Sequence, residues 1–162
     1  MTGKNSRHAE IDHQRGSLET SPDAQTVPLP VPLPGERQVL YIEDNPANMR
    51  LVKKIMSGLG GINLLMAESA ETGMEMATSS LPDLILMDIN LPGMDGFEAL
   101  DCLRISAKTC SIPVVAVTAN AMPDQVLRIN KAGFDGYLTK PIHLQRFVAV
   151  INALLDEREG NE

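Results

Sequence analysis

Five side chains suited to phosphoryl chemistry lie at the ends of four of the short apolar runs in this sequence of 162 residues. Glu43 and Asp44 follow the first such run, Asp88 the second, Thr118 the third and Lys140 the last. Carboxylates are the oxygen ligands that Mg²⁺ prefers, whereas a hydroxyl and an ammonium group can bind phosphoryl oxygens. The set therefore predicts a magnesium-dependent phosphoryl-transfer site, in which a carboxylate acts as the nucleophile and forms an aspartyl phosphate.

Asp88 is the candidate nucleophile because it directly follows a fully apolar run of four residues, which is typical of a buried central strand. Glu43 and Asp44 would then hold the metal ion, and Thr118 and Lys140 would bind the phosphoryl oxygens. Zinc is disfavoured because neither histidine nor cysteine occurs at these positions.

Each of these residues also has an ordinary structural explanation when it is taken alone. A lone aspartate after a strand is most often a turn residue or a helix cap, and Thr118 fits a β-branched strand end. A lysine before a proline is most often a solvated loop residue. The functional interpretation rests on the coincidence of five such residues at four strand ends, which is improbable by chance.

Short strand-like runs alternate with helix-like segments along the chain. Asn45 or Asp44 can cap the first helix, and Asp95 with Glu98 forms a capping box for the third. The expected strands cover 39–42, 62–67, 84–87, 112–117 and 135–138. The expected helices cover 46–59, 69–79 (weakened by a glycine at 73), 95–105 and 123–132, and a last helix has an apolar face made by Leu144, Phe147, Val148, Ile151, Leu154 and Leu155.

This alternation of five strands and five helices predicts a parallel sheet with helices on both faces and right-handed crossovers. A flavodoxin-like (βα)5 fold, an α/β three-layer sandwich with strand order 2-1-3-4-5, suits that number of strands. The first and third strands are then neighbours, and ligands bind beyond their carboxyl ends. Glu43, Asp44 and Asp88 would meet there, and their mutual repulsion favours a bound dication.

Composition disfavours several classes of function. The formal net charge is −7 with a pI near 4.9 and no basic run, which argues against direct binding to nucleic acid. No stretch approaches the roughly 18 apolar residues of a membrane-spanning helix, and no apolar signal core opens the chain. Cys102 and Cys110 lack metal-site spacing and are expected to be reduced thiols in a cytoplasmic protein.

The sequence predicts three parts: a disordered, proline-rich tail over 1–36, one domain over 37–157 and a short charged end over 158–162. Proline occupies every second position from 28 to 34, where an extended spacer is expected. A groove ligand of the P-x-x-P type needs prolines three apart, so the spacer is favoured over a ligand motif.

Four segments together resemble the receiver domain of two-component response regulators. They are 40–45 (LYIEDN), 83–96 (DLILMDINLPGMDG), 113–119 (PVVAVTA) and 136–141 (GYLTKP). The resemblance extends from about Gln38 to Leu155, and the tail before it has no counterpart in the receiver pattern. The sequence EDNPAN at 43–48 is most similar to receivers attached to hybrid histidine kinases.

The resemblance implies a role for each site residue. Asp88 would be the phosphoacceptor, Asp44 a direct Mg²⁺ ligand and Glu43 a ligand through water. The backbone carbonyl of Asn90 would complete the metal site, and Lys140 would contact the phosphoryl group.

The same resemblance implies a conformational switch. Phosphorylation would draw Thr118 toward the phosphate and turn Tyr137 inward, which alters the face made by the last strand and the helices beside it. Asn90 and Asn120 lie where family members tune dephosphorylation. Since neither is an acid that could activate water, slow self-hydrolysis is expected.

The implied phosphoryl donor is a histidine kinase or a histidine phosphotransfer protein that docks beside the first helix, near Asn45, Asn48 and Met49. Because only a short charged end follows Leu155 in this sequence, output is expected through protein contacts or as one module of a longer phosphorelay. The chain would be a switch that catalyses only its own phosphorylation and dephosphorylation, and not otherwise an enzyme.

Three other functions use comparable residues. A phosphatase of the haloacid dehalogenase type needs a second aspartate two residues after the nucleophile, where this chain has Asn90. A nucleotide- or flavin-binding module needs a glycine- or hydroxyl-rich phosphate loop after the first strand, where Glu43 and Asp44 stand instead. A receiver that only docks, without taking phosphate, is disfavoured by the complete set of five site residues.

Overall fold

The computed structural model describes residues 36–159, apart from the side chains of the last two of them. Residues 1–35 of the predicted tail over 1–36 and residues 160–162 of the predicted charged end over 158–162 lie outside the described residues, whereas residues 158 and 159 belong to the last helix. Strands and helices alternate strictly in chain order: β1 (Arg37–Ile42), α1 (Pro46–Ser57), β2 (Ile62–Ala67), α2 (Ala70–Ser80), β3 (Leu84–Asp88), α3 (Gly96–Ile105), β4 (Val114–Thr118), α4 (Pro123–Ala132), β5 (Gly136–Thr139) and α5 (Leu144–Glu159).

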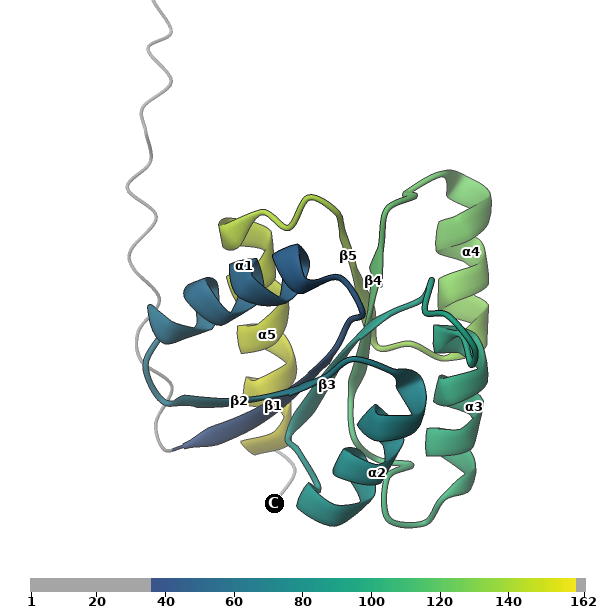
Figure 1. Ribbon diagram of the computed structural model, residues 1–162, viewed down its shortest axis with the longest axis horizontal. Coiled ribbons are helices and arrows are strands. Elements are labelled where there is room, and N and C mark those ends of the chain that lie inside the picture. The colour runs from purple at the N-terminus through teal and green to yellow at the C-terminus, as the bar shows by residue number, and fades with distance from the viewer. Residues whose placement is uncertain (1–35, 160–162) are drawn as a thin grey trace, which may run out of the picture.

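The five strands form one parallel sheet in the order β2-β1-β3-β4-β5, which confirms the predicted fold (Figure 1). Ile42 at the end of β1 pairs with Met87, next to the end of β3. Asp88 in turn pairs with Val117 of β4. The carboxyl ends of the central strands are therefore level with one another, so the residues that follow them share one edge of the sheet.

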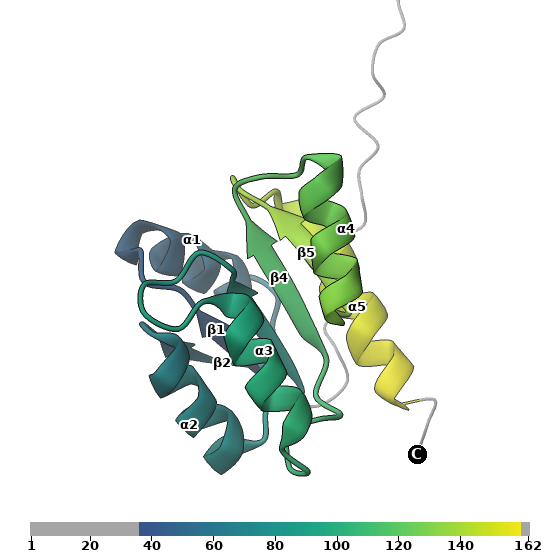
Figure 2. The same ribbon diagram turned by 90° about the vertical axis from the view of Figure 1, so that its right-hand side faces the viewer.

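Helices cover both faces of the sheet (Figures 1 and 2). On one face, α1 and α5 pack with the side chains of one apolar cluster, which includes Val52, Met56 and Phe147. On the other face, α2, α3 and α4 pack with a second cluster that includes Leu100 and Ile129. Because β3 and β4 are buried along their whole length, the central strands read as continuous apolar runs.

The helix starts follow the capping chemistry expected from the sequence. The side chain of Asn45 caps α1 and accepts hydrogen bonds from the backbone N–H groups of Ala47 and Asn48. Asp95 and Glu98 form the expected capping box at α3. The fourth helix has its predicted bounds and ends at a glycine with φ of 97°. Local capping therefore fixes where the chain turns away from the site edge.

The structure departs from the predicted bounds at several places. The first helix ends at Ser57, two residues early, because the chain turns at Gly58 before it reaches the two glycines with positive φ. The fourth strand begins at Val114 because the preceding proline has no N–H to donate. Leu144 was placed on the apolar face of the last helix, but it is the first residue of α5 and is half exposed.

Gly73 has a packing role that propensity alone does not reveal. It was expected only to weaken its helix, yet α2 forms through it. A Cβ atom at this position would lie 2.4 Å from Cδ1 of Ile42. Glycine thus allows α2 to approach the end of β1 closely, directly behind the site residues.

Within residues 36–159, no helix combines the length and the apolar character needed to cross a membrane.

Candidate functional site

The three predicted metal-binding carboxylates lie together at the carboxyl edge of the sheet. One oxygen of each of Glu43, Asp44 and Asp88 lies within 4.8 Å of the others. Glu43 and Asp88 are buried, with 0% and 3% of their surface exposed, whereas Asp44 faces solvent. The loops after β1 and β3 thus bring together residues that are far apart in sequence, as the strand order predicted.

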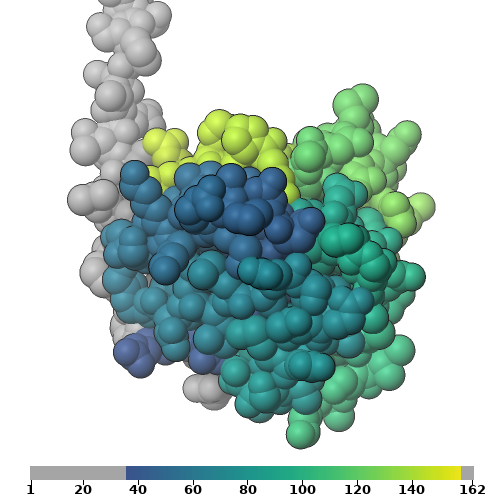
Figure 3. All heavy atoms as spheres, in the orientation of Figure 1, coloured from purple at the N-terminus to yellow at the C-terminus, as the bar shows by residue number. Residues whose placement is uncertain are grey.

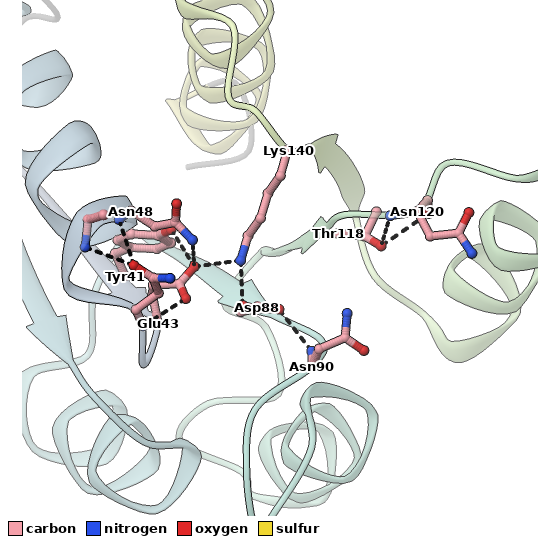
Figure 4. A network of polar contacts seen from close by, with 10 residues as sticks. Tyr41, Glu43, Asn48, Asp88, Asn90, Thr118, Asn120 and Lys140 are labelled. Atoms are coloured by element: carbon pink, nitrogen blue, oxygen red, sulfur yellow. Dashed lines mark hydrogen bonds and ion pairs between the residues drawn. The ribbon is translucent and has the colours of Figure 1, made fainter.

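Lys140 lies between two of these carboxylates (Figure 4). Its Nζ atom is 2.6 Å from Oδ2 of Asp88 and 2.8 Å from Oε2 of Glu43. Lys140 follows β5, and its long side chain extends toward the ends of β3 and β1, so the ammonium group contacts both acids directly (Figure 4).

Glu43 accepts four hydrogen bonds. Its Oε2 atom accepts from the Tyr41 hydroxyl at 3.0 Å, from Nδ2 of Asn48 at 3.2 Å and from Lys140, while Oε1 accepts from the Asn45 N–H at 3.0 Å. The part played by Tyr41 was not predicted from the sequence, and Asn48 was predicted only as a docking residue. A signal was present, since residues two apart on a strand share a face and a buried phenol needs a partner.

The pKa values of these groups reflect burial set against the contacts with Lys140. Burial raises the pKa of Asp88 above its usual range, and the hydrogen bonds from Lys140 and from the Asn90 N–H only partly oppose this. For Glu43 burial also acts to raise the pKa, but the hydrogen bonds, that of Lys140 first, outweigh it and hold the pKa below its usual value. The pKa of Lys140 is raised, because the two carboxylates outweigh the effect of burial.

Burial and the adjacent Glu43 carboxylate raise the pKa of Tyr41, which keeps its hydroxyl protonated as a hydrogen-bond donor.

The remaining predicted phosphoryl-binding and metal residues lie around Asp88. The Asn90 N–H donates to Oδ1 of Asp88 at 2.8 Å. Thr118 is buried at the end of β4, and its hydroxyl donates to the carbonyl oxygen of Asn120 and accepts from the Asn120 N–H, both at 3.1 Å. Thr118 is therefore near the edge that carries Asp88, with its hydroxyl held by the loop that leads to α4.

The predicted switch and docking residues lie on two different parts of the surface. Tyr137 of β5 is partly buried, and the guanidinium carbon of Arg146 is 5.5 Å from its ring centroid. On α1, Asn45 is exposed, while Asn48 and Met49 are half-buried. In the space-filling view the blue surface of α1 borders the yellow surface of α5 (Figure 3).

The donor set suits a hard divalent cation. Three carboxylates face one ammonium group, so the site carries excess negative charge when all are ionised. Hydrogen bonding is complete, since every buried side-chain nitrogen or oxygen in the described part of the chain has a partner. What the cluster lacks is positive charge, which Mg²⁺ with carboxylate and carbonyl ligands can supply.

The response regulator receiver domain family matches residues 39–152, more than half of the chain. The polar-differentiation response regulator DivK of Brucella ovis is 36% identical over 121 residues, which cover 75% of this chain and 98% of that protein.

Two solved structures share the fold. A CheY-like receiver domain protein from Methanospirillum hungatei is 26% identical, with a TM-score of 0.71 over 79% of this chain and all of that one. The receiver domain of a sensor histidine kinase from Pseudomonas aeruginosa is 26% identical, with a TM-score of 0.69 over 75% of this chain and 99% of that one. The latter has a magnesium ion coordinated in its active site cleft.

Proposed function

The chain belongs to the family of response regulator receiver domains, and we propose that it accepts a phosphoryl group on Asp88 in a Mg²⁺-dependent reaction and signals by a change of conformation. The observation that carries the proposal is the cluster at the carboxyl edge of the sheet. Asp88 lies there beside Lys140 and within 4.8 Å of two further carboxylates. Such a cluster supplies a nucleophile, a cation for phosphoryl oxygens and ligands for a metal.

In the proposed reaction, a carboxylate oxygen of Asp88 attacks the phosphorus of a phosphohistidine. The new P–O bond forms as the P–N bond to the donor breaks, and the electron pair of that bond returns to the imidazole nitrogen. Lys140 is already paired with Oδ2 of Asp88, so its ammonium group is close to the oxygens that arrive on the phosphoryl group. The chain then acts as a switch that catalyses only its own phosphorylation and dephosphorylation.

The residues proposed to hold Mg²⁺ are Glu43, Asp44, Asp88 and the backbone carbonyl of Asn90. When bound, the ion would neutralise the charge on the phosphoryl oxygens and on the carboxylates that surround them. Asp44 suits a direct ligand because it is exposed at the mouth of the cluster. Glu43 suits a ligand through water, because its Oε2 atom already accepts three hydrogen bonds from the protein.

The proposed switch couples the phosphoryl group to the surface through Thr118 and Tyr137. The Thr118 hydroxyl exchanges its partner in the Asn120 loop for a phosphoryl oxygen, and the loop before α4 moves with it. Tyr137 then turns inward and leaves the guanidinium group of Arg146, which alters the face made by α4, β5 and α5.

A histidine kinase or a histidine phosphotransfer protein is the proposed donor, as in a cytoplasmic two-component phosphorelay. Docking on α1 near Asn45, Asn48 and Met49 would bring the donor histidine to the site, since α1 starts three residues after Glu43. The surfaces of α1 and α5 adjoin, so a helical partner could contact both (Figure 3).

The test is to incubate the protein with acetyl phosphate and Mg²⁺ and to measure its intact mass. We expect a gain of one phosphoryl group that Asp88→Ala abolishes and that the control Asp101→Ala, an exposed aspartate on α3, retains. Rapid multiple turnover of the donor without a stable adduct would favour a phosphatase. The absence of an adduct with acetyl phosphate and with a phosphorylated histidine protein would favour a docking-only receiver.

A further inference from the structure

We propose that Tyr41 and Asn48 are positioning residues for phosphoryl transfer, which hold the Glu43 carboxylate and, through it, the Lys140 ammonium group beside Asp88. The inference rests on the proposed function, because it assigns these two residues a part in the same site. Neither touches Asp88, and both act through Glu43.

Tyr41 places a hydroxyl group in an otherwise apolar cluster. Its side chain is fully buried in β1 among Val39, Val52 and other residues beneath α1 and α5. A phenylalanine would fill the same space without the cost of burying a polar group. One contact compensates for the burial of this hydroxyl group, namely its 3.0 Å hydrogen bond to Oε2 of Glu43. The hydroxyl group therefore acts on the carboxylate cluster at the carboxyl edge of the sheet.

Asn48 contacts the same oxygen from another element. It lies in the first turn of α1, and its Nδ2 atom donates to Oε2 of Glu43 at 3.2 Å. The Asn45 N–H, from the residue that caps this helix, donates to Oε1 at 3.0 Å. Glu43 is therefore held from the strand beneath it and from the start of the helix beside it (Figure 4).

This arrangement fixes the oxygen that pairs with Lys140. The ammonium group bridges Oε2 of Glu43 at 2.8 Å and Oδ2 of Asp88 at 2.6 Å. With Tyr41 and Asn48 in place, Oε2 has two donors besides Lys140, so the Glu43 carboxylate cannot rotate away from the ammonium group. Loss of either donor frees Glu43 to turn, which displaces Lys140 from Asp88 and disorders the carboxylate that supports the metal.

The first test is Tyr41→Phe, with the Mg²⁺ dissociation constant measured by titration calorimetry on the full chain. We expect binding about tenfold weaker than in the wild type, the lower range for loss of a group that orients a metal ligand. The matched control is Thr109→Val, which removes a buried hydroxyl that donates to the Leu103 carbonyl at 2.8 Å, outside the site. In EDTA this control should lose about as much stability as Tyr41→Phe, but its affinity for Mg²⁺ should be that of the wild type.

Asn48→Ala provides a second variant that leaves the apolar core intact, and we expect a smaller weakening of Mg²⁺ binding in the same direction. A double-mutant cycle then asks whether Tyr41 acts through Glu43. In a Glu43→Ala background the change from Tyr41 to Phe should have no further effect on Mg²⁺ affinity, because the shared partner is gone.

The proposal is overturned if Tyr41→Phe and Asn48→Ala both bind Mg²⁺ within twofold of the wild type. It is equally overturned if the tyrosine change costs the same affinity in the Glu43→Ala background. In either case a wild type that still accepts a phosphoryl group leaves the proposed function standing. A wild type that binds no Mg²⁺ and takes no phosphoryl group would instead remove the proposed function, and this inference with it.

Discussion

The two edges of the sheet each hold a cation among acceptors, but the charges are balanced at one edge and not at the other. At the edge that carries the amino ends of β4 and β5, the Arg104 guanidinium group pairs with Asp135 at 2.8 Å. It also donates to three backbone carbonyls, those of Cys110, Ile112 and Gly133. One acid meets one cation there, and Asp135 in turn accepts the Val114 N–H at 2.7 Å.

At the carboxyl edge, Lys140 faces Glu43 and Asp88 directly, with Asp44 close by. Three acids share one ammonium group, two of them are buried, and the pKa of Asp88 is raised. The contrast separates two uses of charge in one small domain. The balanced cluster is complete and ties loops together, whereas the unbalanced cluster holds negative charge that a metal ion can neutralise.

A large effect on stability that does not depend on metal is expected at the balanced edge. Arg104→Ala removes four hydrogen bonds with a charged donor, one of them the part-buried bond to the Ile112 carbonyl just before β4, which should cost about 3 kcal/mol. Urea unfolding in EDTA and in Mg²⁺ would measure this, and the loss should be the same in both. If Mg²⁺ recovered the lost stability, the two edges would not be independent.

Lys140→Ala should cost a similar amount, about 3 kcal/mol in EDTA, the lower end for removing one partner of a buried ion pair, because it leaves Glu43 and Asp88 without their shared cation. Saturating Mg²⁺ should recover most of that loss, since the dication takes over the neutralisation of the acids. The same urea experiment provides the measurement. If Mg²⁺ leaves the loss unchanged, the carboxylates do not form a metal site.

The smallest expected effect has the opposite sign. Because burial raises the pKa of Asp88 in the folded protein, the charged carboxylate opposes folding. Asp88→Asn should therefore stabilise the metal-free protein at neutral pH, by less than Lys140→Ala costs.

The pH dependence of that difference checks the sign. A raised pKa gives the wild type stability that is fully present below about pH 3.9, the usual aspartate pKa, and lost as the pH rises through the raised value. Asp88→Asn and wild type should thus unfold alike at low pH and diverge as the pH rises. Urea unfolding in EDTA across this range measures it, and a wild type that gains stability relative to the variant would contradict the account.

The sequence predicted the fold because its signals are local and agree with one another. The apolar run before Asp88 predicts a buried strand and where it ends, and the capping box at Asp95 predicts where a helix begins. The strict alternation of such strands and helices then predicts a parallel sheet. The convergence of Glu43, Asp44 and Asp88 follows from strand order alone. Residues that follow neighbouring parallel strands lie at the same carboxyl edge of the sheet.

The contacts between side chains could not be predicted from these local signals or from strand order. The position of the Lys140 ammonium group between two acids depends on the direction of its long side chain, which strand order does not specify. The family resemblance predicts Asn48 only as a docking residue, yet its side-chain amide donates to Glu43. The exposure of Leu144 likewise depends on the residue at which the last helix begins. The spacing of apolar residues along that helix does not determine this residue.

The most direct test of the central claim is to find the residue that carries the phosphoryl group. After incubation with acetyl phosphate, borohydride reduction converts an aspartyl phosphate to homoserine, which peptide mass spectrometry can locate. We predict conversion at position 88 alone, in Mg²⁺ and not in EDTA. Conversion at another acid, or equal conversion at position 88 in EDTA, would contradict the claim that the crowded carboxyl edge is a metal-dependent phosphoacceptor site.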